Sequence, residues 1–461
     1  MSDATTTDLY EVTMAMSYLR EGMAGPATFS LFVRDLPPDR GFLVAAGLES
    51  ALNYLADFRV GPEDVDAFAA ALHRPRRDLE PLLGLEFTGD VRAVPEGRIV
   101  LAAEPLLEVT APLPQAQLAE TYVLNQLSHQ TAIASKAVRC VLAAAGHPVV
   151  DFSLRRTHGP EAGFQAARLG ALAGFAGTSN VASATALGIP AVGTMAHSFV
   201  EAFATEEEAF RAFARTHPGP VTLLVDTYDT EAGVGVAARV LRDLDRGTGS
   251  AVRLDSGDLA ALAARARSIL DGAGLPDIGI IASGSLDEYA VDDLVRSGTP
   301  IDTYAVGTRV GVSADAPYVD SAYKLVEYDG RPVMKLSSAK VTAPGPKQVF
   351  RRPGYADVIA LADEPPPEAG RPLLETVMQG GRRTSKRPTL DECRERLAAD
   401  LAELPSAARR IRAPVAPRAM ASDRLSSLAA QVRRRIGEET PTASRAGRER
   451  TSSGSHRSVP N

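Results

Sequence analysis

The sequence is poor in cysteine and has no excess of positive charge. Its two cysteines, Cys140 and Cys393, lie far apart among 461 residues. Two cysteines exclude a framework of disulfides and a zinc site built from cysteine thiolates. A chain of this kind is typical of a reducing compartment, so we predict a cytoplasmic protein. The formal net charge of −7 argues against binding nucleic acid or an anionic membrane surface through bulk charge.

Signals for membrane insertion and secretion are also absent. The N-terminus carries Asp3, Asp8 and Glu11 and lacks the basic segment of a secretory signal. The stretch from Leu169 to Val200 contains no formally charged residue, and its length would suit a transmembrane helix. Glycines, Pro190 and an asparagine interrupt the stretch, which therefore predicts several short buried elements.

Several common catalytic motifs are missing. The sequence contains neither a P-loop nor a GxGxxG dinucleotide motif. No lysine occurs between Lys136 and Lys324, so the middle of the chain offers no lysine for a Schiff base. This absence argues against aldolase-type chemistry.

The composition is that of an ordinary globular protein, with 45% hydrophobic and 23% charged residues. The length suggests two or three domains. We predict four parts: residues 1–146, which mix short strands and helices; an α/β catalytic domain over 147–314; return strands and C-terminal helices over 315–436; and a disordered tail over 437–461, which has almost no residues to bury.

The two ends of the chain have distinct patterns. In the N-terminal part we predict a half-buried strand over Ala27–Val33, a helix over Pro62–Leu72, consecutive strands over Val91–Val109 and one helix or a pair over Pro114–Ala145. After Asp315 we predict antiparallel strands that return to the N-terminal part, followed by two helices. These are Tyr318–Glu327, Pro332–Leu336, Gln348–Arg351, Leu390–Leu404 and Asp423–Ile436.

The middle of the chain alternates apolar strand-like runs with helical patterns such as Thr230–Leu244 and Leu259–Leu270. This alternation predicts parallel strands joined by crossover helices. Seven such runs fit a barrel-like α/β domain better than a short open sheet. The runs are Val149–Phe152, Ala173–Ala176, Pro190–Val192, Val221–Val225, Ala251–Leu254, Ile278–Ala282 and Ile301–Val306.

Polar residues and glycines cluster directly after these predicted strands. In barrel enzymes the active site lies at the carboxyl ends of the strands, where late loops often hold a phosphate. Arginines bind anions in a bidentate manner, and carboxylates can hold ribose hydroxyls or Mg²⁺ through water. We therefore predict a sugar-phosphate or nucleotide site. Its candidates are Arg155, Arg156, Thr178, Ser179, Asn180, Gly193, Thr194, His197, Asp226, Arg253, Asp255, Ser256, Ser283, Gly284, Ser285, Gly307, Thr308 and Arg309.

Each candidate also has a purely structural explanation. Arg155 and Arg156 fit a solvated pair. Asp226 and Asp255 fit N-caps of the following helices. His197 precedes Ser198-Phe-Val-Glu201, which has the spacing of a capping box. Their joint occurrence at seven strand ends on one face favours a functional site.

Short segments across the chain carry a family resemblance. They are Thr7-Asp-Leu-Tyr-Glu-Val-Thr13, Gly177-Thr-Ser-Asn180, Gly193-Thr-Met-Ala-His-Ser-Phe-Val200, Val252-Arg-Leu-Asp-Ser-Gly-Asp258, Tyr323-Lys-Leu325, Lys335-Leu-Ser337 and Pro344-Gly-Pro-Lys347. In this order they resemble nicotinate phosphoribosyltransferases, of the type II phosphoribosyltransferase family. The resemblance implies an irregular TIM-like α/β barrel beside an α/β sandwich domain formed from the N- and C-terminal parts of the chain.

The resemblance also implies a reaction. Nicotinate would attack C1 of 5-phosphoribosyl 1-pyrophosphate, giving nicotinate mononucleotide and pyrophosphate in a step of NAD biosynthesis. ATP would be a co-substrate, hydrolysed through a phosphohistidine at His197, and Mg²⁺ would be required. Asp226 and Asp255 are the candidates to hold that metal through water. The family is typically a homodimer whose shared active site receives Tyr10 from the neighbouring subunit.

The same resemblance implies roles for individual residues. His197, Asp255 and Arg253 are the catalytic candidates, with Asp255 holding the ribose and Arg253 at the nicotinate and diphosphate end. Tyr10, Thr194 and, less directly, Phe152 would contact nicotinate, and Arg155 would meet the pyrophosphate. The 5′-phosphate would lie against Gly284, Ser285, Gly307 and Thr308.

Three other functions compete with this one. Nicotinamide phosphoribosyltransferase has an aspartate in the segment that matches Gly177–Asn180, where this chain has Ser179. An aspartate about 4 Å from the nicotinate carboxylate would cost about 4 kcal/mol at an effective dielectric of about 20, so serine favours nicotinate. A catalytically silent binding protein would be expected to have lost His197 or Asp255. A quinolinate-using relative needs extra cations, and the predicted barrel has no lysine.

Overall fold

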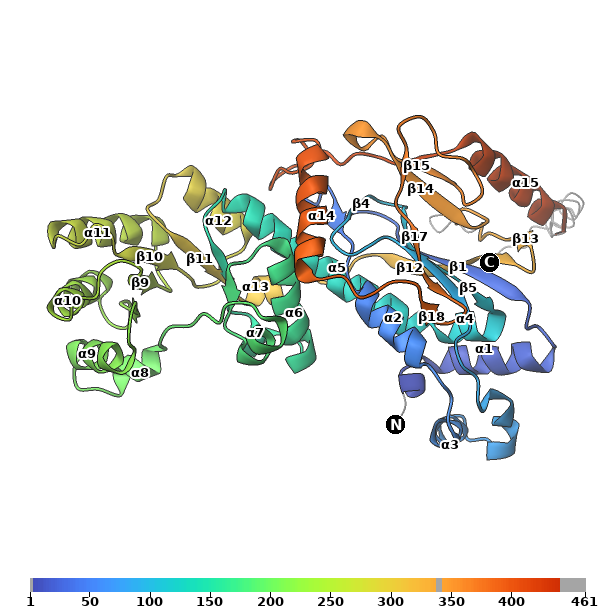
Figure 1. Cartoon of the computed structure of the whole chain (residues 1–461), viewed down its shortest axis with the longest axis horizontal. Helices are drawn as coiled ribbons and strands as arrows, with labels where there is room; N and C mark the ends of the chain where they lie inside the picture. The colour runs from blue at the N-terminus through green and yellow to red at the C-terminus, as the bar shows by residue number, and fades with distance from the viewer. Residues whose placement is uncertain (1–2, 337–341, 440–461) are drawn as a thin grey trace, which may run out of the picture.

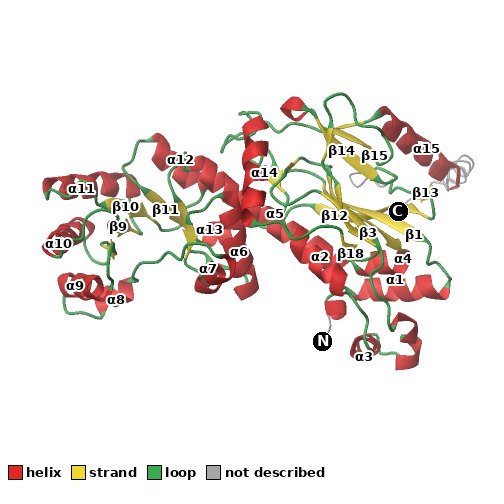
Figure 2. Cartoon of the chain, viewed as in Figure 1, coloured by secondary structure: helices red, strands yellow, loops and turns green. Residues whose placement is uncertain are grey.

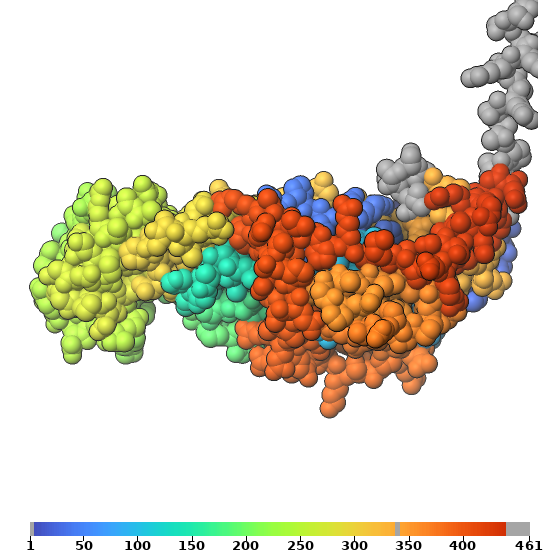
Figure 3. Space-filling model, turned by 90° about the horizontal axis from the view of Figure 1, so that it is seen from above, coloured from blue at the N-terminus to red at the C-terminus, as the bar shows by residue number. Residues whose placement is uncertain are grey.

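The computed structural model describes residues 3–336 and 342–439. Two halves lie end to end (Figure 1), one built on a parallel sheet and the other on mainly antiparallel sheets. The space-filling view in Figure 3 shows the lobe of residues 200–300 at one end and the C-terminal segments over the other half. The two ends of the chain therefore contribute to the same half.

The larger sheet of the second half joins segments from both ends of the chain. All its neighbouring strands are antiparallel, and Ala27 of β1 pairs with Tyr328 of β12. In order across the sheet they are β13 (Arg331–Pro332), β12 (Ser321–Tyr328), β1 (Pro26–Val33), β5 (Pro105–Pro112), β3 (Asp90–Ala93), β17 (Glu375–Gln379) and β18 (Arg382–Arg383).

Two smaller sheets complete this half. One pairs β2 (Leu43–Val44) with β4 (Ile99–Val100). The other contains four strands, which in order are β16 (Arg371–Pro372), β14 (Lys347–Arg351), β15 (Val358–Leu361) and β19 (Met420–Ala421). The helices of this half are α1 (Leu9–Arg20), α2 (Leu48–Asp57), α3 (Pro62–Ala71), α4 (Leu113–Leu118), α5 (Glu120–Ala143), α14 (Leu390–Glu403) and α15 (Asp423–Glu439).

The parallel sheet of the first half is a half-barrel. Its helices lie outside the strands in Figure 2. The strands run in the order β7 (Gly177–Thr178), β6 (Val149–Asp151), β11 (Thr303–Val306), β10 (Gly279–Ala282), β9 (Ala251–Leu254) and β8 (Thr222–Leu224). The helices are α6 (Pro160–Ala173), α7 (Val181–Leu187), α8 (His197–Glu201), α9 (Glu206–Thr216), α10 (Thr230–Asp243), α11 (Leu259–Gly272), α12 (Glu288–Arg296) and α13 (Thr308–Gly311).

The predicted α/β class is confirmed, with two corrections in the barrel. Residues 173–176 were predicted as a strand, but Ala173 ends α6 and Gly174 caps it in a left-handed conformation with φ of 107°. The alanine- and leucine-rich sequence before Gly174 favours helix over strand. Pro190–Val192 forms only an isolated bridge, between Ala191 and Thr178, so six strands rather than seven make the sheet.

The chain's uncharged stretch is divided as predicted. Residues 169–200 cover the end of α6, β7, α7 and the start of α8. Within residues 3–336 and 342–439, no helix has the length and apolar character needed to cross a membrane.

In the second half, the prediction of a half-buried strand over Ala27–Val33 is wrong in its burial. Almost all of β1 is buried, since β12 and β5 flank it. The buried hydroxyls of Thr28 and Ser30 are satisfied by Thr110 and Glu108 of β5. The predicted helices over 62–72, 390–404 and 423–436 are confirmed as α3, α14 and α15, and 114–145 forms a pair, α4 and α5.

The C-terminal return was predicted only in part. The predicted strand Tyr318–Glu327 is confirmed as β12, but only the first residue of Pro332–Leu336 lies in a strand, β13. Gln348–Arg351 belongs to β14, which is in the four-stranded sheet. That sheet still packs on the N-terminal part, because the Lys347 N–H donates to both Glu108 carboxylate oxygens at 3.0 Å. The tail predicted to be disordered lies mostly outside the described residues, and α15 continues to Glu439.

Helix α5 connects the two halves. Its N-terminal residues Val123 and Leu127 belong to the hydrophobic core of the antiparallel half, whereas Ile133 and Ala137 belong to that of the barrel. Buried Lys136 on the same helix is ion-paired with Glu288, the first residue of α12. The barrel loops before α12 therefore rest on a helix that is anchored in both cores.

Buried Glu11 on α1 gives the fold a predicted pH dependence. Its carboxylate accepts hydrogen bonds from the Thr121 N–H at 3.0 Å and the Thr7 hydroxyl at 2.6 Å. Burial raises the pKa of Glu11 from 4.5 to about 7, although these hydrogen bonds oppose the rise. The folded state then binds this proton more tightly than the unfolded chain, so the contribution of Glu11 to stability is greatest below pH 4.5 and is lost as the pH rises to about 7.

We expect Glu11→Gln to reduce the fall in stability with rising pH by about 3 kcal/mol, at 1.36 kcal/mol per pKa unit. Urea unfolding of both proteins at pH 5 and pH 8 measures it. Glu21→Gln, which alters an exposed carboxylate just beyond the same helix, is the control and should keep the wild-type fall. An equal fall for Glu11→Gln and wild type would contradict the assignment.

Candidate active site

Two adjoining cavities lie at the carboxyl ends of the barrel strands. The larger measures about 420 Å³ and the smaller about 240 Å³. Both are lined by Phe152, Arg155, Arg253 and Asp255, so they form one site. The larger is also lined by Ser179, Gly193, Thr194, Met195, Ala196, His197 and Leu224, and the smaller by Arg156, Ser283, Gly284, Ser285, Ala305, Gly307 and Thr308.

The structure brings together all the predicted catalytic and substrate-binding residues except Tyr10. Tyr10 lies on α1 in the other half, far from β9 and β10 in Figure 1, and its side chain is close to Glu120. It is exposed, so it is available to another molecule.

Arg253, in β9, is the centre of the hydrogen-bond network. Its side chain is only 9% exposed. The guanidinium donates to Ser283 Oγ at 2.8 Å, to Thr194 Oγ1 at 2.8 Å and to Asp255 Oδ1 at 2.6 Å. Its Cζ also lies 5.5 Å from the centroid of the Phe152 ring. The network holds a cation between an aromatic ring and a carboxylate, with its orientation set from three sides.

Asp255 is held as a carboxylate. Burial opposes its ionisation, but hydrogen bonds from Ser283 and Arg253, with the charges of Arg253 and His197, lower the pKa of Asp255 below its ordinary value. Its backbone N–H donates to Asp226 Oδ2 at 2.9 Å. The site therefore presents a fixed negative charge beside a fixed positive one.

His197 faces Asp255 from the opposite wall. Its Nε2 is 3.7 Å from Asp255 Oδ2, and its Nδ1 is 3.1 Å from Thr227 Oγ1. His197 is the first residue of the short helix α8, and Ala196 is the N-cap. Ser198 therefore does not begin a capping box, and the purely structural explanation of this motif is wrong.

The N-cap explanation for the two strand-end aspartates is also wrong. The caps of α10 and α11 are Asp229 and Asp258. Asp226 instead accepts hydrogen bonds through Oδ2 from the Asp255 N–H and the Ser256 hydroxyl. Its Oδ1 is buried and accepts no hydrogen bond from the residues that the structure describes. One oxygen of this carboxylate is therefore left without a hydrogen bond, although Asp226 itself is not among the residues that line the two cavities.

The two arginines after β6 lie in a 3₁₀ turn, Leu154–Arg156. Both are exposed, as a solvated pair would be, but both also line the site. Opposite them, Gly284 has φ of 86°, and a Cβ there would lie 1.8 Å from the carbonyl oxygen of Asp255. Only glycine permits this close approach, so the turn at Gly284 lies directly against the backbone of Asp255.

Two residues that hydrogen-bond to the predicted site residues were not assigned a role from the sequence. Thr227 follows Asp226 and bonds to His197, and Ser283, recognised as a strand end but given no role, bonds to both Arg253 and Asp255. Both could have been found from their positions, since Thr227 directly follows Asp226 and Ser283 directly follows the predicted strand Ile278–Ala282.

Family models match most of the chain. The N-terminal domain of nicotinate phosphoribosyltransferase matches residues 5–128, the family's main region matches 148–296, and its C-terminal domain matches 368–429. The chain is 48% identical to nicotinate phosphoribosyltransferase pncB2 of Mycobacterium tuberculosis, covering 85% of each chain. It is 42% identical to the Bacillus subtilis nicotinate phosphoribosyltransferase, covering 78% of this chain and 76% of that one.

Solved structures agree with the sequence matches. The crystal structure of human nicotinic acid phosphoribosyltransferase superposes with a TM-score of 0.81 at 30% identity, covering 92% of this chain and 99% of that chain. A Pyrococcus furiosus structure described as nicotinate-nucleotide pyrophosphorylase has a TM-score of 0.73 at 25% identity, covering 87% of this chain and 96% of that chain. The chain belongs to the nicotinate phosphoribosyltransferase family.

Proposed function

We propose that this protein is a nicotinate phosphoribosyltransferase, which makes nicotinate mononucleotide and pyrophosphate from nicotinate and 5-phosphoribosyl 1-pyrophosphate. The observation that carries the proposal is the site itself. Two adjoining cavities, both lined by Arg253 and Asp255, together contain His197 and the glycine turn at Gly284, in a chain of this family. Such a site offers separate places for an aromatic acid and for phosphates.

The charges of the site match those of the reaction. As the bond from C1 to pyrophosphate breaks, negative charge grows on the leaving group and C1 becomes oxocarbenium-like. Arg155 and Arg253 lie where they can stabilise the first, and the ionised Asp255 can stabilise the second. The ring nitrogen of nicotinate is unprotonated at neutral pH, so no strong base is needed.

Ser179 supports nicotinate rather than nicotinamide. It lines the larger cavity together with Phe152 and Thr194. A hydroxyl can donate a hydrogen bond to the carboxylate of nicotinate and adds no like charge. The relatives named above are nicotinate enzymes, which agrees with this assignment.

We propose that Mg²⁺ is held through water and substrate phosphates. The chemistry of the donors fits, since Asp226 Oδ1 is buried without a partner among the described residues and the Asp255 carboxylate is close by. Within residues 3–336 and 342–439, no cluster of three or more acidic, histidine or cysteine side chains forms a cage. Mg²⁺ usually binds one or two carboxylates plus phosphates, and when bound here it would neutralise the diphosphate.

We also propose a cytoplasmic homodimer in which Tyr10 enters the neighbouring subunit's site. Exposed Tyr10 and Leu9 lie at the start of α1, on the half opposite to their own chain's cavity. Cys140 and Cys393 are buried free thiols, as expected in a reducing compartment.

The direct test supplies the purified protein with phosphoribosyl pyrophosphate and either nicotinate or nicotinamide, with and without ATP. Mononucleotide formation is followed in each case. We expect nicotinate to be turned over faster, and preferential use of nicotinamide would refute the proposal. Binding of both substrates without turnover would instead identify a catalytically inactive binding protein.

We expect His197→Ala to keep slow transferase activity and to lose coupled ATP hydrolysis, because the proposed phosphate acceptor is removed. ATP consumption per mononucleotide formed is the measurement. His217→Ala changes an exposed histidine outside the site and should retain the wild-type coupling. Undiminished coupling in the His197 variant would reject the phosphohistidine.

A further inference from the structure

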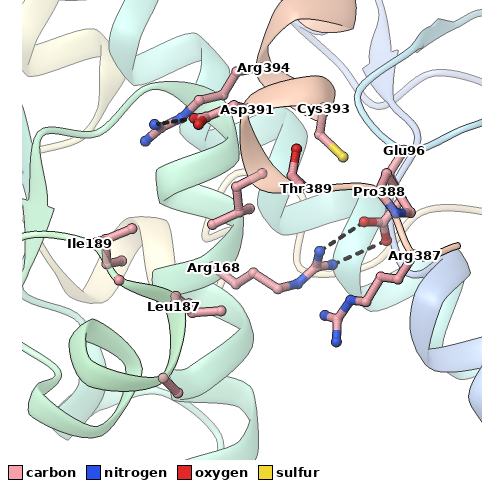
Figure 4. A pocket seen from close by; sticks show the side chains of 13 residues that line it. Glu96, Arg168, Leu187, Ile189, Arg387, Pro388, Thr389, Asp391, Cys393 and Arg394 are labelled. Atoms are coloured by element: carbon pink, nitrogen blue, oxygen red, sulfur yellow. Dashed lines mark hydrogen bonds and ion pairs between the residues drawn. The ribbon is translucent and has the colours of Figure 1, made fainter.

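Another cavity, separate from the two of the candidate active site, lies between the two halves and is called the second cavity below. Its volume is about 400 Å³, within the range of small-molecule sites. One wall comes from the end of α7 and the turn after it, residues 186–189, and the other from residues 387–394 at the start of α14. Buried Arg168 of α6 lies at its base (Figure 4).

The walls of this cavity favour an anion. Three arginines line it, and Figure 4 shows the Arg168 guanidinium turned to Glu96 with that of Arg387 beside it. The two acids on the wall are already paired. Glu96 meets Arg168 at 2.8 and 3.1 Å, and Asp391, whose side chain is 83% exposed, lies 3.4 Å from Arg394.

Arg387 is the cation most available to a ligand. Its side chain is 56% exposed, and its ion pair with Glu49 is a long one, made through Nε at 3.7 Å. The planar guanidinium matches the oxygens of a phosphate group. Thr389 lines the same wall, where it is the N-cap of α14 and its oxygen accepts the Glu392 N–H.

The remaining wall is apolar. Leu187, Ile189, Pro388 and Leu390 line the cavity beside the arginines. Apolar side chains next to a few placed cations suit a ligand with a flat organic part and a phosphate. The cavity therefore fits an organic phosphate of about mononucleotide size.

One short segment of the chain, residues 179–193, connects the second cavity to the candidate active site. Ser179 lines the active site, α7 then leads to Leu187 and Ile189 at the second cavity, and the chain returns to the active site at Gly193. The returning segment is held to β7, because the Thr178 N–H donates to Pro190 O at 3.0 Å and the Val192 N–H to Thr178 O at 2.9 Å.

These hydrogen bonds allow a change at residues 187–189 to be passed along the chain to the active site. A ligand that contacts Leu187 or Ile189 touches a segment whose next residues include Thr194, which accepts a hydrogen bond from Arg253. We propose that the second cavity binds an organic phosphate of mononucleotide size and thereby changes the affinity of the active site for its substrates. This goes beyond the proposed function, and binding there can be measured without turnover.

The test uses AMP as the probe and two charge reversals at neighbouring residues. Arg387→Glu changes a cation of the cavity wall, whereas Lys386→Glu makes the same change in net charge at an exposed residue outside the lining. AMP is titrated calorimetrically into the full-length proteins without nicotinate mononucleotide, which is itself an organic phosphate of this size. Any AMP bound at the active site is common to the three proteins, so the part of the binding that depends on Arg387 reports on the second cavity. We expect binding by wild type and Lys386→Glu, and binding weaker by about tenfold or more in Arg387→Glu.

Kinetics test the link. AMP should change the KM for phosphoribosyl pyrophosphate in wild type and in Lys386→Glu, and this change should be lost in Arg387→Glu. No AMP binding by wild type, or equal weakening in the two variants, would overturn the site. Binding without any change in KM would overturn the coupling. Absence of transferase activity would refute the proposed function while leaving the calorimetric result to stand by itself.

Discussion

Replacing Ser179 by aspartate is expected to reverse the base preference of this protein. A second carboxylate about 4 Å from that of nicotinate would cost about 4 kcal/mol at an effective dielectric of about 20, or roughly a thousandfold in binding. Nicotinamide has no such charge and can instead donate its amide N–H groups to the new carboxylate. The kcat/KM values for nicotinate and nicotinamide measure the reversal directly.

The control for this change is Ser179→Asn, which has nearly the size of aspartate without its charge. We expect it to lower nicotinate turnover modestly and to keep nicotinate as the better substrate. The Ser179 backbone N–H donates to Asp151 O at 2.8 Å, so neither substitution removes the contact that holds this residue in place. If both variants lose nicotinate activity equally, crowding rather than charge explains the result.

Asp255→Asn is expected to lower kcat/KM for nicotinate by a factor of about 10² to 10³, the usual cost of losing one preorganised electrostatic group. The substitution removes the charge that would face the developing oxocarbenium ion. It also leaves Arg253 without its ionic partner, although the hydrogen bonds of Arg253 to Ser283 and Thr194 remain. Steady-state kinetics with varied phosphoribosyl pyrophosphate measure the loss.

Asp258→Asn is the matched control, since it removes the same charge three residues away. Asp258 is the N-cap of α11, and its carboxylate accepts the Ala261 N–H at 3.1 Å. Asparagine caps a helix as well as aspartate does, so activity and stability should both stay close to wild type. A loss in Asp258→Asn as large as in Asp255→Asn would mean that general charge, rather than the position of Asp255, matters.

The strand-end positions of the site were predictable because the carboxyl ends of parallel strands meet on one face. Arg155 follows β6, Asp255 follows β9 and Thr194 follows the isolated bridge at Ala191, and all three are brought to the same cavity. Strand identity was less predictable. The run at 173–176 is apolar enough for a strand, but it follows a long alanine-rich helical segment and ends it at Gly174. Short apolar runs do not distinguish helix ends from strands.

Strands formed by the C-terminal part were mostly not predicted. β15, β17 and β19 contain few residues, and their ladders depend on partners far away in the sequence, such as Met378 against Val91. Such strands form because a sheet edge is available to them, which a local pattern does not reveal.

The sequence by itself determined the α/β class, the family and nearly all the residues of the cavity, because the motifs that follow strands are recognisable from the local order of residues. Only the tertiary structure decided which of these side chains bond to one another. The packing of separate loops brings His197 to Thr227 and surrounds Arg253 with its three hydrogen-bonding partners. The arrangement of the two halves keeps Tyr10 away from its own cavity. The second cavity has the same origin, since its walls are two hundred residues apart in the chain and meet only where α14 packs beside α6.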